Sequence, residues 1–219
     1  MHMRILTLII LAMSVCLGLG TGAMAEPVVV ASYDFLVDLT DTPWTEIAQI
    51  PQYNPADFGG QELVQVDVYL KLGVVGDVTF NGNNTTVTGA EAGGLLTLQG
   101  PAGIDDSLEA LQQLAPPEIQ LVEGQPVEMD VVAVSEAWYW FDDAAILAAS
   151  TGNGTVDYEL AANGSLMLQI IGGNISVDQN TAVSAQLTVE YKVVPEPASV
   201  SLLILGAIGL IGLVRKRNV

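Results

Sequence analysis

Apolar and polar residues alternate along much of this chain, and this pattern constrains the fold more than any other feature. From Val64 to Leu72, valine or leucine stands at every even position and a polar residue or tyrosine at every odd one. From Val183 to Val193, the odd positions are apolar or aromatic and the even ones polar. Because successive side chains of a strand point to opposite faces, each stretch predicts a strand with one buried face.

Shorter alternating stretches fill most of the space between these two. They predict further strands at Val28 to Leu39, Val74 to Phe80, Leu95 to Leu98, Val127 to Val134, Val156 to Leu160 and Leu166 to Ile171. Glycine- and asparagine-rich steps that favour turns separate them: Asn81-Gly82, Gly93-Gly94, Asn153-Gly154, Asn163-Gly164 and Gly172-Gly173-Asn174.

One segment departs from this alternation. From Asp106 to Leu114, leucine recurs every third residue, and Asp106 with Glu109 can cap free backbone amides, so the segment predicts a short helix. Pro116-Pro117 is expected to end it, because proline has no amide donor. The fold expected for residues 26–194 is all-β: one antiparallel β-sandwich ectodomain with one short helix.

The two ends of the chain are apolar and flanked by cations. At the N-terminus, Arg4 precedes an apolar run and the small-residue site Ala23-Met24-Ala25, which predicts a signal peptide at residues 1–25, cleaved after Ala25 by signal peptidase. This implies passage through the general secretion machinery.

The C-terminal segment, residues 195–219, begins with Pro195-Glu196-Pro197. The apolar run 198–214 holds 17 residues, about 26 Å of helix, against a bilayer core of about 30 Å. This predicts a transmembrane helix, and Arg215, Lys216 and Arg217 would act as a stop-transfer signal that stays in the cytoplasm. Residues 26–194 would then lie on the outer side of the membrane.

The composition of residues 26–194 narrows the possible chemistry. The only histidine, His2, and the only cysteine, Cys16, fall in the expected signal peptide, which excludes disulfides, histidine triads and thiolate sites from the ectodomain. Lys71 and Lys192 are its only cations against 24 acidic residues, a formal charge of −22. This charge disfavours nucleic acid as a partner. No cofactor, metal site or catalytic residue is expected, although calcium held by separate loops stays an open alternative.

The aromatic cluster at residues 138–141 is the strongest candidate for binding. On a strand, Trp138 and Trp140 share a face, and two indoles beside the carboxylates of Glu136 and Asp142 could form a platform for carbohydrate. The alternative is ordinary strand packing, with one face in the core and the other a half-covered surface, which we favour. Adjacent acids such as Asp105-Asp106 do not form a glycosidase pair, because neighbours on a strand face opposite sides.

Both the tail and the ectodomain resemble known families. The string from Val194 to Arg217, with its Pro-Glu-Pro motif, apolar span and basic cluster, closely resembles the PEP-CTERM sorting signal of exosortase substrates in Gram-negative bacteria. The resemblance implies that a membrane-embedded exosortase is a partner and cleaves near Pro195-Glu196-Pro197. The chain would cross the inner membrane only transiently, and then reach the cell surface or extracellular space.

The ectodomain resembles the choice-of-anchor E family. The resemblance rests on Gln52-Tyr53-Asn54-Pro55 with Phe58-Gly59, on Gly152-Asn153-Gly154-Thr155-Val156, and on the stretch from Ala185 to Tyr191. This family brings no known catalytic activity. We therefore expect a non-enzymatic, structural or adhesive protein of the surface or extracellular matrix. The alternative is a module that binds exopolysaccharide through Trp138 and Trp140.

Overall fold

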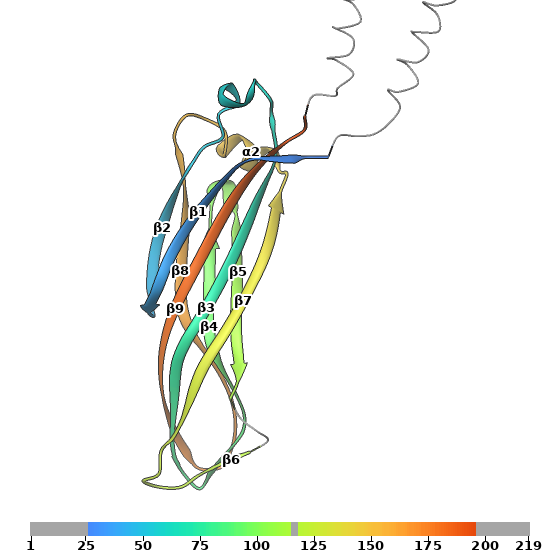
Figure 1. Ribbon diagram of the computed structural model, residues 1–219. Helices are drawn as coiled ribbons and strands as arrows, with labels where there is room; N and C mark the ends of the chain where they lie inside the picture. The colour runs from blue at the N-terminus through green and yellow to red at the C-terminus, as the bar shows by residue number, and fades with distance from the viewer. Residues whose placement is uncertain (1–25, 115–117, 196–219) are drawn as a thin grey trace, which may run out of the picture. The chain divides into compact units, whose positions relative to one another are not determined.

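The computed structural model describes residues 26–114 and 118–195 (Figure 1). The predicted signal peptide at residues 1–25 lies outside these ranges, as do Pro116-Pro117, Glu196-Pro197, the apolar run 198–214 and the basic residues 215–217. The sandwich unit runs from Val29 to Lys192 and is described by itself. Within the described ranges, no helix is both long and apolar enough to cross a membrane.

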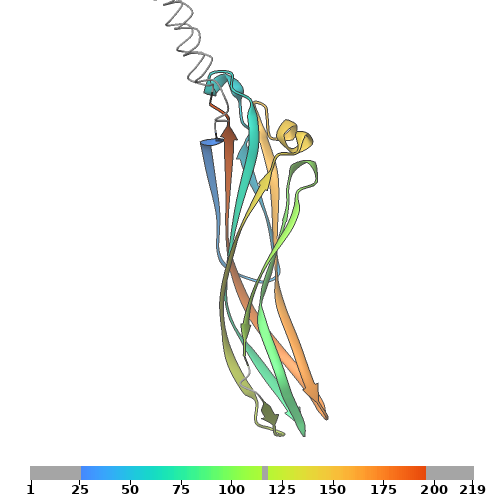
Figure 2. The ribbon, with the colours of Figure 1, turned by 90° about the vertical axis from the view of Figure 1, so that its right-hand side faces the viewer.

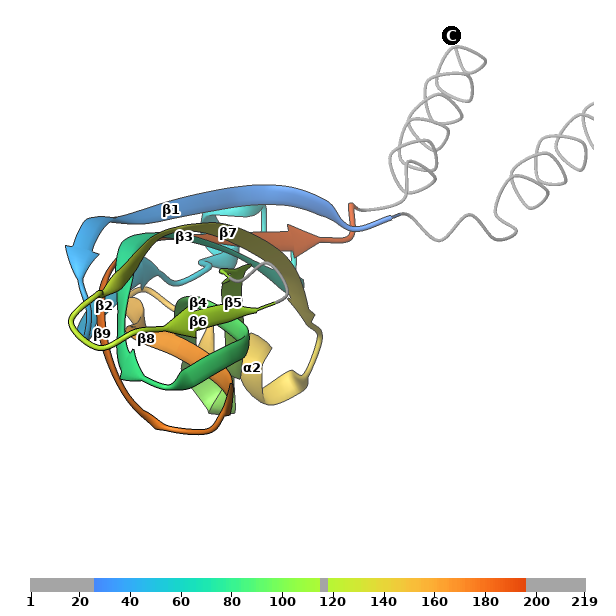
Figure 3. The ribbon, with the colours of Figure 1, turned by 90° about the horizontal axis from the view of Figure 1, so that it is seen from below.

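Two antiparallel sheets form the sandwich unit. The first has the order β1 (Val28–Asp41), β9 (Asn174–Val193), β3 (Leu63–Asn83) and β7 (Val127–Phe141). The second has the order β2 (Trp44–Pro51), β8 (Thr155–Ile171), β4 (Thr85–Gln99) and β5 (Asp105–Gln113), with β6 (Ile119–Leu121) paired to β4. The two layers are seen from the side in Figure 2 and end-on in Figure 3. The antiparallel sheets expected from the sequence are confirmed.

The alternating stretches form strands, with the predicted faces inward. In β3, Val66, Val68, Leu70 and Leu72 are fully buried, and β9 buries its odd-numbered residues from Val183 onward. Several predicted strands are parts of longer ones. Residues 64–72 and 74–80 both lie in β3, and residues 156–160 and 166–171 both lie in β8.

Three of the predicted turns are instead strand interior. Asn153-Gly154 and Gly172-Gly173 do lie in bends, but Asn81-Gly82, Gly93-Gly94 and Asn163-Gly164 lie inside β3, β4 and β8. Gly93 shows one reason. A Cβ atom on Gly93 would lie 1.8 Å from the carbonyl oxygen of Ala110, so glycine here permits close approach of β5.

The helix predicted from Asp106 to Leu114 is wrong, because this segment is strand β5. It pairs with β4 from Gln99↔Asp105 to Glu91↔Gln113. An isolated helix of this length is marginal, and a sheet edge offers backbone hydrogen bonds and a core for Leu108. In the part of the chain that the structure describes, the helical segments are α2 (Ala144–Ala149) and the 3-10 turns η1 (Pro55–Phe58) and η2 (Pro101–Gly103). Asp143 caps α2 by accepting a 2.8 Å hydrogen bond from the Ala145 amide.

Buried tyrosines join the two layers. Tyr53, Tyr158 and Tyr191 have exposed fractions of 1%, 0% and 0%. The rings of Tyr53 and Tyr191 meet edge to face at 6.0 Å, and the Tyr191 hydroxyl donates to the carbonyl of Pro51 at 2.9 Å. Tyr53 also stacks on Phe58 at 5.1 Å, so the loop that carries η1 is attached to the core.

Candidate functional site

The outer face of β7 carries both tryptophans of the predicted cluster. Trp138 is 52% exposed and Trp140 is 71% exposed, whereas Tyr139 and Phe141 on the other face are partly covered. Strand packing with a half-covered outer surface, the interpretation that we favoured, is compatible with Tyr139, Phe141 and Trp138, whereas Trp140 is more exposed than that interpretation requires. Trp138 and Trp140 are two residues apart on one strand, so their indoles lie on the same side of the sheet.

A third aromatic side chain joins them from the neighbouring strand. β3 pairs with β7 so that Tyr69 lies opposite Trp138 and Asp67 opposite Trp140. The rings of Tyr69 and Trp138 have centroids 4.9 Å apart and planes tilted by 41°. We call Tyr69, Trp138 and Trp140 the aromatic strip. The sequence did not single out Tyr69, although its odd position in the alternation of β3 already assigned it to the polar face.

Hydrogen bonds fix the rim of the aromatic strip. The Tyr69 hydroxyl donates to Glu136 Oε2 at 2.7 Å. This hydrogen bond, with smaller contributions from burial and from the Glu136 charge, raises the pKa of Tyr69. The hydrogen bond uses one oxygen of Glu136, which leaves its other carboxylate oxygen at the edge of the strip.

Both cations of the sandwich unit lie on this same sheet. Lys192 on β9 forms an ion pair with Asp67, which also accepts a hydrogen bond from the Gln65 amide. Lys71 is exposed and lies opposite Glu136 in the pairing of β3 with β7. The charges beside the strip are therefore nearly balanced, in contrast to the −22 of residues 26–194 as a whole.

A shallow groove lies on the same face and includes Lys71. It has a volume of about 270 Å³, and it is bordered by residues of β1, β3 and β9: Leu36, Asp38, Lys71, Gly73, Ser184 and Gln186. Glycine at position 73 leaves space for the groove, because a Cβ atom there would lie only 2.7 Å from the Ser184 hydroxyl. This face therefore carries a raised aromatic part and, beside it, a hollow lined by both polar and apolar groups.

The acidic residues considered from the sequence have structural surroundings. Burial, together with the charge of Asp105, raises the pKa of Asp106, and Asp143 caps α2. In residues 26–114 and 118–195, no three histidine, cysteine, aspartate or glutamate side chains are grouped so that they could hold a metal ion.

Of the predicted sorting residues, only Pro195 lies in the described part of the chain, two residues beyond the end of β9. Glu196, Pro197, Arg215, Lys216 and Arg217 lie outside it, as do Ala23 and Ala25. Their roles stay predictions from the sequence.

Residues 193–218 match the family described as the PEP-CTERM protein-sorting motif. The resemblance expected for the tail is therefore confirmed. The motif implies an exported protein that crosses the membrane and is targeted by an exosortase. The resemblance of the sandwich to the choice-of-anchor E family stays a prediction.

Solved structures show only distant similarity to this chain. A structure of the infectious bursal disease virus Gx strain has 13% identity and a TM-score of 0.21, covering 77% of this chain and 38% of that chain. The D431N mutant VP2 protein of the same virus has 12% identity and a TM-score of 0.21, covering 84% and 49%. Eiger TNF from S. frugiperda has 10% identity and a TM-score of 0.27, covering 78% and 98%. The chain thus spans less than half the length of the two viral chains.

No curated protein matches the chain.

Proposed function

We propose that this chain is a non-enzymatic protein of the cell surface or extracellular matrix, and that its sandwich binds a polysaccharide on the aromatic strip. Export and targeting by an exosortase follow from the PEP-CTERM motif at residues 193–218. By binding a polysaccharide, the exported sandwich would serve a structural or adhesive role. We expect the producer's own exopolysaccharide to be the ligand.

The observation that carries the proposal is the exposure of Trp138 and Trp140 side by side on one sheet face. Large aromatic side chains contribute most when buried, and two exposed indoles on one face are typical of a surface that a partner covers. Sugar rings present C–H groups on their faces and hydroxyls at their edges. An indole can pack against the C–H groups on the ring face, while Glu136 and the Tyr69 hydroxyl can form hydrogen bonds with the sugar hydroxyls.

Charge supports a carbohydrate over other polymers. The formal charge of −22 repels nucleic acid and anionic lipid. Near the strip, Lys192 is paired with Asp67 and Lys71 lies opposite Glu136, so no strong local field opposes a polymer with little charge.

The test compares the full chain, as its host exports it, with Trp140→Ala, Trp138→Ala and Val134→Ala variants. Val134 is the matched control, because it lies on the same exposed face of β7. We expect the wild type and Val134→Ala to sediment with the producer's exopolysaccharide and to change tryptophan fluorescence when it is added. Each tryptophan variant should lose about 1 to 3 kcal/mol of binding free energy, which is about 5-fold to 150-fold in affinity, by analogy with other aromatic stacking platforms.

Equal retention of all four proteins, or an unchanged fluorescence spectrum of the wild type, would contradict polysaccharide binding at this strip. The assignment as an exosortase-targeted protein does not depend on this result.

A further inference from the structure

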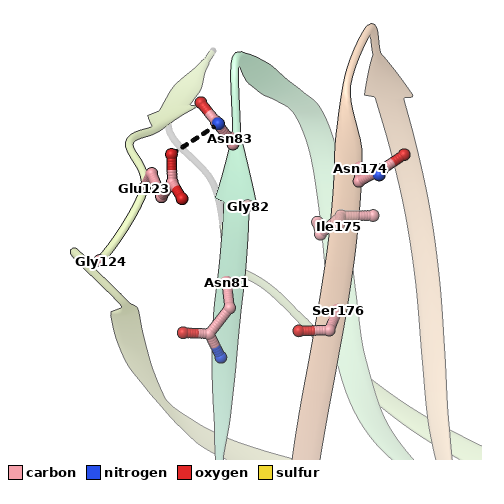
Figure 4. Close-up of a pocket in the computed structure, with 8 residues that line it drawn as sticks. All are labelled: Asn81, Gly82, Asn83, Glu123, Gly124, Asn174, Ile175 and Ser176. Atoms are coloured by element: carbon pink, nitrogen blue, oxygen red, sulfur yellow. Dashed lines mark hydrogen bonds between the residues drawn. The ribbon is translucent and has the colours of Figure 1, made fainter.

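A second hollow, wide open to solvent, lies at the opposite end of β3 from the aromatic strip. It has a volume of about 370 Å³ and is lined by residues of β3, β9 and the turn between β6 and β7: Asn81, Gly82, Asn83, Glu123, Gly124, Asn174, Ile175 and Ser176 (Figure 4). We call it the asparagine pocket. Nothing in the PEP-CTERM assignment or in the aromatic strip involves these residues.

Asn81 and Gly82 lie inside a strand, although neither residue type favours strands. The sequence predicts a turn at Asn81-Gly82, yet both residues continue β3, which ends at Asn83. Asparagine and glycine are poor strand formers, and positions where local preference is overridden are often functional. Gly82 allows tight packing, because a Cβ atom there would lie 2.8 Å from Leu121 Cδ1 and 3.1 Å from the Asn174 carbonyl oxygen.

The pocket is partly pre-arranged. Asn83 donates a 2.9 Å hydrogen bond to Glu123 Oε2, and Gly124, with φ of +74°, forms the turn that places Glu123 there. Figure 4 shows this as the one hydrogen bond between the side chains drawn, with the Ser176 hydroxyl directed toward β3. Within residues 26–114 and 118–195, neither the side-chain amide of Asn81 nor the hydroxyl of Ser176 forms a hydrogen bond, so both can offer donors and acceptors to a ligand.

The chemistry of these groups selects a neutral ligand with many hydroxyls. The Asn81 amide offers two donors and one acceptor, and a pair of sugar hydroxyls can both donate to it and accept from it. Of the described residues, none that lines the pocket is a cation, so they offer an anion no attraction, and the one carboxylate among them is too few oxygens for a cage around calcium. The volume is at the lower end for ligand pockets, which fits one or two sugar rings.

We infer that the asparagine pocket is a second saccharide site, which takes one or two rings of an uncharged sugar. The inference rests on the proposed polysaccharide binding and extends it. Asn81 and Tyr69 are both odd-numbered residues of β3, whose pairing with β7 is continuous from Val66 to Phe80. They belong to one face and are separated by about 40 Å of strand. Two contacts on one rigid element would hold a polymer more tightly than either alone.

The first measurement follows the side-chain amide signals of asparagine by NMR in the exported, isotope-labelled full chain. The probes are D-glucose, D-galactose, D-mannose and N-acetyl-D-glucosamine, each added alone, and calcium chloride added alone. We expect at least one sugar to shift the signals of Asn81 and Asn174, and calcium to leave them unchanged. Asn153, which is exposed in the bend before β8, provides an internal control that should not shift.

The second measurement uses Asn81→Ala and Ser176→Ala, with Asn153→Ala as the matched control and circular dichroism to confirm folding. Each pocket variant should weaken binding to the exopolysaccharide by about tenfold through loss of the second contact. The fluorescence response of Trp138 and Trp140 should remain.

If no sugar shifts the pocket signals while the tryptophan response stays intact, the second site is wrong and the proposed function stands. If calcium alone shifts them, the pocket is a cation site and the inference is also overturned. If neither the pocket nor the tryptophans respond to any saccharide, both proposals fail.

Discussion

Single residues show how this chain, with neither histidine nor cysteine in residues 26–194, stabilises its core. Tyr158 and Tyr191 are fully buried in the sandwich. Burial raises the pKa of both hydroxyls; the neighbouring Ser150 offsets part of this for Tyr158, whereas the charges of Tyr158 and Tyr33 add to it for Tyr191. The Tyr158 hydroxyl has no well-formed hydrogen bond among the described residues.

These tyrosines predict a loss of stability at alkaline pH. Tyrosine in the unfolded chain ionises near pH 10, whereas the buried hydroxyls keep their protons to higher pH. Above about pH 10 the unfolded state therefore binds fewer protons, and the free energy of unfolding falls as pH rises. Below that pH the contribution is fully present. Urea midpoints measured from about pH 8 to pH 11 should show this decline.

Tyr158→Phe is the informative variant for this decline. It removes one buried ionisable group without breaking a hydrogen bond to another described residue, so it should change stability little at neutral pH and make the alkaline decline less steep. An alkaline slope identical to that of the wild type would show that Tyr158 does not contribute.

At the scale of elements, side chains of β5 and β7 join one edge of the first sheet to one edge of the second. The Gln112 side chain accepts a 2.6 Å hydrogen bond from the Val132 amide, and the Tyr139 hydroxyl donates to the Ser107 carbonyl at 3.0 Å. These contacts satisfy backbone groups that exposed edge strands leave unpaired. They also hold β7 with its tryptophan face outward.

The strand assignment of β5 gives a prediction that separates it from a helix. As a strand, β5 buries Leu108, which is 8% exposed, but only partly covers Leu111. Leu108→Ala should therefore cost about 2 to 3 kcal/mol of unfolding free energy, and Leu111→Ala less than half of that. A helix with leucine at every third position would make the two losses similar, so equal losses in urea denaturation would contradict the strand.

For the whole molecule, the net charge and the sorting motif are both typical of an exported protein. Residues 26–194 carry 24 acidic residues and two lysines, and this net negative charge favours solubility. They contain no cysteine, so their folding does not depend on disulfides formed in an oxidising compartment. The PEP-CTERM motif follows β9 almost directly, since its match begins at residue 193. The sandwich therefore has almost no linker before the segment that the exosortase reads.

Processing at this motif predicts a defined new C-terminus. We expect intact-mass analysis of the protein recovered from the envelope or medium to show a chain that ends near Pro195 and lacks Arg215 to Arg217. A variant with Glu196→Ala should remain uncut and keep the basic tail, because its Pro-Glu-Pro motif is broken. Recovery of the wild type with the tail still attached would contradict cleavage.

The sequence by itself determined the most clearly alternating strands and their faces, because alternation with period two is a local property; it indicated no strand at β2, β5 or β6. It correctly identified β3 and β9, the inward side of each, and the sorting motif. It also placed Trp138 and Trp140 on one face of a strand. Neither their outward direction nor the contact with Tyr69 could be predicted, since aromatic residues stand on both faces of β7.

Only the tertiary structure decided the roles of the glycines, of residues 105–113 and of the asparagines at the end of β3. The same Asn-Gly or Gly-Gly step forms a turn when no strand lies beside it, and continues a strand when a neighbour supplies hydrogen bonds and requires close approach, as Ala110 does at Gly93. Those neighbours come from distant parts of the chain. Pairing partners are set by the burial and hydrogen bonding of the whole sandwich, and this long-range information has no counterpart in a short stretch of sequence.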